Sequence, residues 1–169
     1  MNGLMIVLRL VHVVAGVLWV GTALLNTFFL GPTVAATGEV GQKFMAHLVS
    51  QAHLSARITL ASYLTVFAGA SLYWIASRAF TSAWQASGPG LGFGIGGLAG
   101  LVGFGFGQLV SKHATLLAKL AGQLHGAPSP EQAATMRQAS SKMTSASWVS
   151  TAFLIVALAL MGTARYWLF

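Results

Sequence analysis

The chain has 169 residues, of which 56% are hydrophobic and only 7% are charged. An average soluble domain carries about a quarter charged residues, so this composition excludes an ordinary soluble globule, and the hydrophobicity excludes a disordered chain. Nine residues are Lys or Arg and two are acidic, Glu39 and Glu131, which gives a formal net charge of +7. The basic residues are scattered beside apolar runs, so nucleic acid is not an expected partner. Cysteine is absent, which excludes disulfides and thiolate metal sites.

Four apolar segments are long enough to cross a bilayer, which takes about 20 residues in a helix. They cover residues 4–30, 58–77, 91–110 and 146–166. The first is closed by Gly31-Pro32, and its apolar run is longer than the core of a signal peptide. The sequence therefore predicts a single domain of the all-α class, an integral membrane four-helix bundle in a lipid bilayer.

The distribution of Lys and Arg between the connections predicts the orientation of the bundle. The connections after the first and third spans share one side and hold six of these residues: Lys43, Arg57, Lys112, Lys119, Arg137 and Lys142. The other side holds three, Arg9, Arg78 and Arg165. Because the side richer in positive charge faces inward, we expect both termini to lie outside, in the periplasm if the membrane is a bacterial inner membrane.

The connections on the inner side are predicted to be helical. Ser129 can cap a helix whose first residue is Pro130, and Gln132 at the third position can complete a capping box. No further Pro follows up to residue 166, so this helix would be about 55 Å long and would extend beyond the inner membrane face. Residues 39–57 are interpreted as an extension of the second span, and residues 110–123 as an extension of the third.

The third span carries glycines at steps of three and four, which form one stripe along a helix. They are Gly92, Gly96, Gly100, Gly103 and Gly107. Such a stripe allows a second helix to approach closely, either within the bundle or across a homodimer or a larger membrane complex. The alternative is that these glycines, among them Gly96 and Gly100, leave room for the ring of a cofactor.

His12 is the only histidine inside a predicted span, and an ionisable group at that depth is rare. Imidazole is a common axial ligand of haem iron, and Met161, at the same predicted depth on the fourth span, could be a second one. Arginines at the same interface could hold the haem propionates by charge-assisted hydrogen bonds. They are Arg9, Arg78 and Arg165. The alternative is that His12 hydrogen-bonds a neighbouring helix, at Ser71 or Tyr73.

The remaining histidines fall on the predicted inner extension and are His47, His53, His113 and His125. A metal site formed by His47, His53 and His113 is one hypothesis. His47 and His53 are six positions apart, however, which places them on different faces of a helix. The preferred interpretation is a set of solvated surface side chains.

Several classes of activity find no support in the sequence. Neither acid lies in a span, although proton pumps and cation carriers generally use carboxylates there. Because the whole chain has only two carboxylates, catalysis by a pair of acids is not expected. No Ser-His-acid triad is expected either, because no acid lies inside a span. Whether the protein is an enzyme stays open, and any catalysis would need a bound cofactor.

Two stretches resemble a known group of proteins. Leu-Val-His-Val-Val-Ala-Gly-Val-Leu-Trp-Val-Gly over residues 10–21, followed by Gly31-Pro32, is similar to the opening of small bacterial four-span membrane proteins. Met-Gly-Thr-Ala-Arg-Tyr over residues 161–166 is similar to their closing stretch. The group includes CopD-like copper-resistance domains and HemJ-like protoporphyrinogen oxidases, and the chain looks closest to short members without assigned activity. The likeness to the HemJ-like group implies haem binding at His12.

The chain also departs from these families. The HemJ-like group carries a His-x-Lys pattern at the opening of the third span, where residues 92–97 of this chain are only glycine and apolar residues. This difference argues against porphyrinogen oxidation. CopD-like domains are associated with copper handling, but the chain has no Cys and its six Met form no paired copper motif.

The leading hypothesis is a membrane protein that binds haem b near the outer face through His12 and has a redox or electron-transfer role. One alternative is a non-catalytic accessory or structural subunit that packs in a membrane complex through the glycine stripe. A further alternative is the handling of copper or another metal at the inner histidines.

Overall fold

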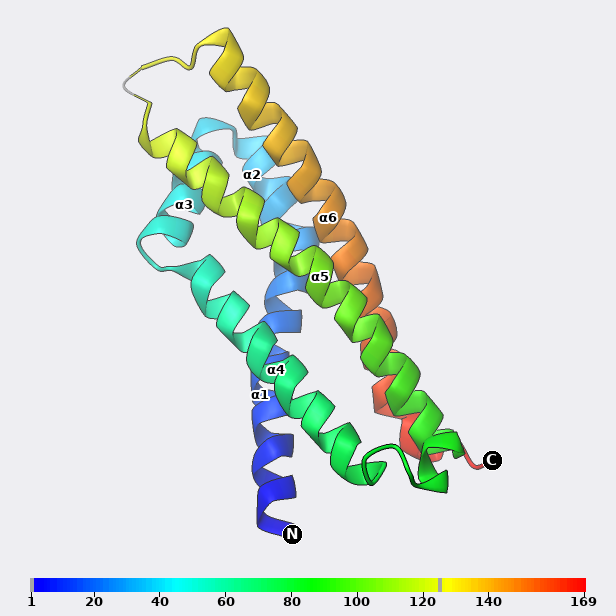
Figure 1. Ribbon diagram of the computed structural model, residues 1–169. Coiled ribbons are helices and arrows are strands. Elements are labelled where there is room, and N and C mark those ends of the chain that lie inside the picture. Colours follow the sequence, from blue (N-terminus) through cyan, green and yellow to red (C-terminus); the bar gives the residue numbers. More distant parts are fainter. Residues whose placement is uncertain (1, 125) are drawn as a thin grey trace.

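The chain forms long helices that run side by side, and the computed structural model describes residues 2–124 and 126–169 (Figure 1). His125, one of the histidines expected on the inner extension, lies outside the described residues. Four helical stretches are long and apolar enough to cross a membrane: Gly3–Thr37, Leu54–Ala76, Gly88–Gly122 and Pro130–Tyr166. The described residues form helices and no strand, so the predicted class, an all-α membrane helical bundle, is confirmed.

The helix of the first span continues beyond Gly31-Pro32, where the sequence predicts that the span closes. Helix α1 (Asn2–Leu25) passes through a π-helical turn, η1 (Asn26–Leu30), into α2 (Gly31–Thr37). A proline lacks the N–H of a regular helix and its ring collides with the carbonyl four residues earlier. The wider turn directly precedes Pro32 and accommodates it, with the Gly31 N–H donating to the Asn26 carbonyl.

The segment after the first span is a separate helix and not an extension of the second span. Helix α3 (Glu39–Ser50) follows Gly38, whose φ of +55° lies in the left-handed region that glycine adopts at low cost. It ends before His53, which also has a positive φ of 51°, and α4 (Leu54–Ala76) begins at the next residue. The predicted continuous helix over residues 39–57 is therefore wrong, because apolar spacing does not reveal a break of three residues.

The connection from α4 to α5 reverses the chain through three consecutive residues with positive φ. Arg78, Ala79 and Phe80 have φ values of 49°, 56° and 64°, which is unusual for residues that carry a Cβ. The buried Ser77 holds this turn, since its hydroxyl accepts a hydrogen bond from the Phe80 N–H at 3.2 Å. A short 3-10 helix, η2 (Ala83–Ala86), then leads into α5.

The two longest helices begin at capped ends. In α5 (Gly88–Gly122) the Ser87 hydroxyl accepts from the Gly90 N–H at 3.3 Å. Helix α6 (Pro130–Thr163), which continues as the 3-10 turn η3 (Ala164–Tyr166), begins with the predicted capping box. The Gln132 N–H donates to the Ser129 hydroxyl and the Ser129 N–H to the Gln132 side chain. The predicted helical continuations of the third and fourth spans are confirmed.

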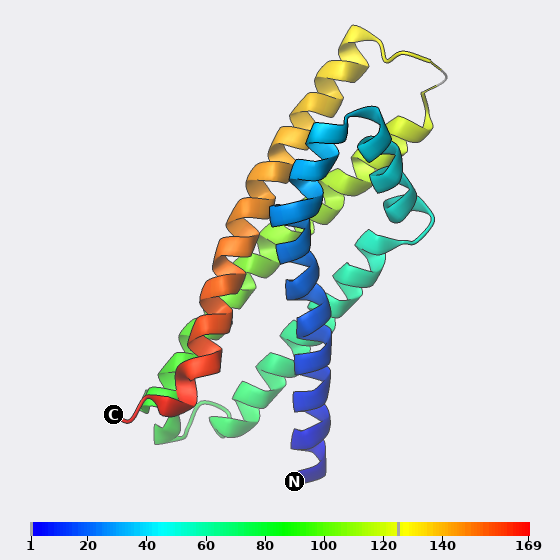
Figure 2. The same cartoon turned by 180° about the vertical axis from the view of Figure 1, so that it is seen from behind.

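The helices associate as two pairs (Figures 1 and 2). Helices α5 and α6 lie together along their length, whereas α1 crosses α4, and Trp19 and Leu154 share the core cluster where the pairs meet. Both termini lie at one end of the bundle, called here the terminal end (Figure 2). Helices α2 and α3 lie at the opposite end, called here the α3 end. Most large apolar side chains face outward, as expected where lipid covers the surface.

Candidate functional site

His12 lies on α1 at its contact with α4. Its Nδ1 atom is 2.8 Å from the carbonyl oxygen of Thr65. Because a carbonyl oxygen can only accept a hydrogen bond, Nδ1 carries a proton, and Nε2 is the ring nitrogen that can hold a lone pair. His12 thus hydrogen-bonds a neighbouring helix, but through Thr65. The hydroxyls of Ser71 and Tyr73 donate instead to other backbone carbonyls.

Gly69 makes the room that the His12 ring occupies. A Cβ atom at position 69 would lie 2.7 Å from Cε1 and 2.9 Å from Nδ1 of His12, which is closer than real atoms allow. The imidazole is therefore in direct contact with the backbone of α4. This contact and the hydrogen bond to Thr65 fix the orientation of the ring.

The glycine stripe of α5 faces the α6 side of the same chain. A Cβ at Gly96 would lie 2.9 Å from the Met161 Cγ atom, and a Cβ at Gly103 would lie 2.9 Å from the Leu154 Cγ atom. The other three positions meet Ala164 at Gly92, Ala157 at Gly100 and Ser150 at Gly107. The stripe thus serves close packing inside the bundle, and α6 side chains occupy the space that a cofactor ring or a partner helix would need.

The other residues expected around a haem do not gather at His12. Met161 lies against α5, with its Cε atom 4.0 Å from the Cβ position of Gly97. Three exposed arginines lie on or beside three different helices, namely Arg9, Arg78 and Arg165. Figures 1 and 2 show that the ends of α1 and α6 at the terminal end are apart, with α4 and α5 between them. Arg9 is the nearest in sequence, three positions before His12 on α1, where side chains are neighbours on one face.

The three described inner histidines do not come together in one site. His47 is exposed on α3, and His53 is exposed between α3 and α4. The His113 Nδ1 atom lies 2.7 Å from the Leu109 carbonyl oxygen of its own helix. Within residues 2–124 and 126–169, no group of three or more His, Asp or Glu side chains is placed to hold a metal ion. His47, His53 and His113 are therefore described here as separate side chains, and the metal hypothesis stays a prediction.

A cavity of about 110 Å³ lies among all four spans toward the α3 end, and Met45 and Val49 of α3 line one side. Most of its surface is apolar, and it is called here the polar cavity because of the hydroxyl and carboxamide side chains in its wall. Its wall includes two carboxamides, from Asn26 and Gln108, and none of its lining residues is charged. Eight hydroxyl side chains complete it: Thr22, Ser55, Thr59, Ser62, Ser111, Ser147, Ser150 and Thr151. A cavity of this size and polarity has room for a few waters or a small polar molecule.

Some of the polar groups around the cavity bond each other and some are left free. The Gln108 amide nitrogen donates to the Ser62 hydroxyl at 3.2 Å. Among the described residues, no protein partner is found for the Asn26 side-chain amide or for the Gln108 side-chain oxygen. Every fully enclosed side-chain N or O atom in this part of the chain has a partner, so these free groups border open space.

A buried hydroxyl cluster joins the π turn to α6 beside this cavity. The Thr27 hydroxyl lies 2.7 Å from the hydroxyls of both Ser147 and Thr151. All three side chains are buried. In an apolar environment such interhelical hydrogen bonds hold the helices in register, so the cluster fixes the position of the π turn and of Asn26 next to it.

The polar cavity was not predicted from the sequence, although one signal was available. Asn26 and Gln108 are the only carboxamide residues inside the four predicted spans. Polar side chains at that depth face the interior of a bundle or a cavity. Their convergence could not be read from the sequence, because it depends on how α1 and α5 face each other.

No family model, no curated protein and no solved structure matches the chain. The resemblance to CopD-like and HemJ-like proteins therefore stays a prediction. His12 and the polar cavity are the two candidate sites of the described structure.

Proposed function

We propose that the protein binds haem b through His12 within the membrane and acts in electron transfer. The observation that carries this proposal is the contact of 2.8 Å between the His12 Nδ1 atom and the Thr65 carbonyl oxygen. A histidine that ligates a metal almost always donates its other ring N–H to a carbonyl, a carboxylate or water, which fixes the tautomer and makes the ligating nitrogen more basic. His12 has this arrangement, which leaves Nε2 for an iron atom.

The neighbouring residues have separate roles in this proposal. Thr65 sets the tautomer of His12, Gly69 lets the ring approach α4, and Arg9 is available for a propionate. When bound, haem b supplies reversible one-electron chemistry. Met161 is not included, because its side chain packs against the Gly96 backbone. The proposal therefore has one ligand from this chain.

Absorbance of the purified protein after reconstitution with hemin tests the proposal. We expect a Soret band that corresponds to about one haem per chain, lost in His12→Ala and in His12→Gln. The glutamine variant keeps a side-chain N–H for the Thr65 carbonyl, so its loss of haem would not reflect a lost helix contact.

Two variants serve as controls for this measurement. His113→Ala removes a histidine whose Nδ1 also contacts a helix carbonyl. Met161→Leu removes the methionine that the sequence offers as a second ligand. Both are expected to keep the Soret band. A wild-type protein without a band, or a His12→Ala variant with an unchanged band, would contradict the proposal.

The polar cavity supports a second candidate function, the binding of a small uncharged polar molecule. The supporting observation is the pair of carboxamides with free hydrogen-bonding groups, on Asn26 and Gln108, in a wall without charge. A charged ligand would lack a counter-ion there, whereas an amide or an alcohol could replace the missing partners. This function does not depend on haem.

Thermal stability in the presence of acetamide, a small neutral amide, tests this second candidate. We expect saturable stabilisation of the wild-type protein, and none in Gln108→Met, which keeps the size of the side chain and removes its polar atoms. Gln42→Leu, at an exposed position of α3, is the control and should respond as the wild type does. Equal stabilisation of all three proteins would show a solvent effect and rule the site out for this probe.

We further propose that the bundle lies in a bacterial inner membrane with both termini outside. The excess of Lys and Arg beside the α3 end supports this orientation. The natural chain has no cysteine, so single cysteines can be introduced directly. Ala86→Cys at the terminal end should react with a membrane-impermeant maleimide in intact spheroplasts, and Ser140→Cys on α6 should not. The opposite pattern would reverse the orientation.

A further inference from the structure

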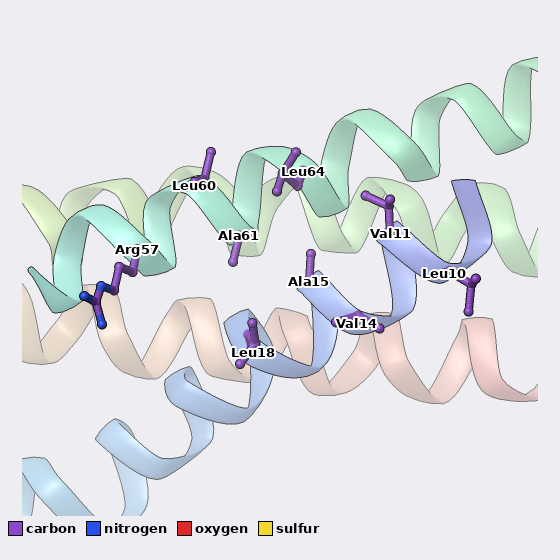
Figure 3. Close-up of a pocket in the computed structure, with 9 residues that line it drawn as sticks. All are labelled: Leu10, Val11, Val14, Ala15, Leu18, Arg57, Leu60, Ala61 and Leu64. Carbon is purple, nitrogen blue, oxygen red and sulfur yellow. The ribbon is translucent and has the colours of Figure 1, made fainter. Parts of the chain in front are cut away.

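A lipid-facing groove runs along the contact between α1 and α4 (Figure 3). It has a volume of about 450 Å³, and eight of its nine lining residues are apolar. The floor is formed by Ala15 and Ala61, which are 7% and 6% exposed and point toward one another in Figure 3. Larger side chains form the rims: Leu10, Val11, Val14, Leu18, Leu60 and Leu64. The groove is open above these two positions because alanine on both helices has a small side chain, whereas the neighbouring lining residues are larger.

Arg57 is the one charged residue that lines this groove, and it lies at one end of the groove, in the first turn of α4 (Figure 3). Within the described residues, its guanidinium has no ion pair and no hydrogen bond. Neither acid of the chain forms an ion pair with Arg57: Glu39 pairs with Lys43, and Glu131 lies in the first turn of α6. A guanidinium has five N–H groups arranged to bind a carboxylate or a phosphate.

The length of the groove matches one leaflet of a membrane. From Leu10 to Leu18 it follows eight residue steps of α1, or about 12 Å. One leaflet contributes about half of the roughly 30 Å hydrocarbon core. Arg57, in the first turn of α4, lies where that leaflet meets the headgroups, and the apolar walls continue toward the middle of the membrane.

We propose that this groove is a binding site for an anionic diacyl phospholipid of the leaflet at the α3 end. One acyl chain lies over Ala15 and Ala61 between the leucine and valine rims, and the phosphate binds Arg57. Charge complementarity selects the anionic lipid, because a zwitterionic headgroup brings its own cation to the phosphate. His12 does not line this groove.

Native mass spectrometry of the detergent-purified protein tests this site. The protein is equilibrated with equal amounts of phosphatidylglycerol and phosphatidylcholine that carry identical acyl chains. We expect the wild type to retain at least five times more phosphatidylglycerol, and Arg57→Gln to lose that preference. Val14→Trp, which fills the groove from its rim without changing charge, should lower the retention of both lipids.

Two controls separate a specific site from general attraction. Lys112→Gln removes one positive charge from an exposed position of α5 that does not line the groove, and it should keep the preference. Glycerol 3-phosphate carries a phosphate without acyl chains and should not displace the lipid. An unchanged preference in Arg57→Gln, equal losses in Arg57→Gln and Lys112→Gln, or displacement by glycerol 3-phosphate would each overturn the proposal.

Discussion

The two helix pairs of this bundle use small residues for opposite purposes. Along α5 and α6, glycines bring the helices so close that side chains such as Leu154 fill the space between the backbones. Along α1 and α4, Ala15 and Ala61 leave an open groove on the lipid side, and Gly69 makes space for an imidazole. The polar cavity also has walls from α1 and α4. The α5–α6 contact is thus the closed part of the fold, whereas the α1–α4 pair carries His12 and the groove and shares the polar cavity with α5 and α6.

This difference suggests a division between scaffold and function. Two helices whose backbones are in close contact have little freedom to rearrange. Such a pair can hold a binding site on neighbouring helices in a fixed position. A pair that leaves a groove, a cavity and a fixed histidine can bind molecules without losing its main contacts. Substitutions in the glycine stripe of α5 should change stability, whereas substitutions that reach a candidate site, on either pair, should change binding.

The largest effect is expected from Gly103→Leu in the α5–α6 pair. Its Cβ would lie 2.9 Å from the Leu154 Cγ atom, and overpacking of this kind costs about 1–3 kcal/mol or more. We expect a markedly lower melting temperature in detergent, or loss of the monodisperse protein. Gly105→Leu, two positions along the same helix with nothing within 4 Å of its Cβ position, is the matched control. Similar stability of the two variants would contradict the closed packing of this pair.

The second largest effect is expected from Thr27→Val, where the two pairs meet. Valine keeps the shape of the side chain but removes the hydroxyl that bonds both Ser147 and Thr151. Loss of these buried bonds should destabilise the protein by about 1–2 kcal/mol, measured by thermal unfolding. Thr37→Val removes an exposed hydroxyl that bonds only within its own helix, and it should unfold as the wild type does.

A smaller change in stability, with a larger change in binding, is expected from Gly69→Ala. The added methyl group overlaps the His12 ring, so the ring must move away from the Thr65 carbonyl. We expect at least a fivefold loss of haem retention after reconstitution. At Gly16, in the same helix contact, a Cβ would have an ordinary distance of 3.5 Å to Thr65, so Gly16→Ala should retain haem. If both variants retain haem equally, the ring position is not important for binding.

The smallest effect is expected outside both pairs, from Glu39→Gln on α3. The hydrogen bond and the charge of Lys43 lower the pKa of Glu39 below its ordinary value of 4.5. A lowered folded-state pKa stabilises the fold above the unfolded value, and this contribution is lost as the pH falls through the folded value. Melting temperatures of variant and wild type should differ slightly at pH 7 and coincide at pH 3. A larger difference at pH 3 would contradict this sign.

The parts of the fold that depend on local sequence were predictable. The capping box at Ser129 and Gln132 needs only residues three positions apart, and the glycine stripe of α5 needs only helical spacing. Both are present as expected. The four spans follow from composition, because long runs of apolar side chains favour the bilayer, and a helix satisfies the polar backbone groups there within one segment.

The parts that depend on how helices face each other were not predictable. His12 and Met161 were expected at the same depth, but depth does not define which neighbour a residue contacts, and they lie in different helix pairs. The break between α3 and α4 occurs at Gln51-Ala52-His53, without the Gly or Pro that usually marks one. The groove needs both Ala15 and Ala61, which are common residues with no signal of their own.

The π turn at Asn26–Leu30 also sets the rotational phase of the first span. It contains one residue more than a regular turn, and each residue of an α-helix corresponds to a rotation of about 100°. The side chains of α2 are therefore out of phase with the pattern that α1 would continue. Deleting one residue in this turn would restore a regular helix and rotate α2, together with α3, relative to α5. The number of residues in the first span therefore determines which side chains of α2 and α3 face α5.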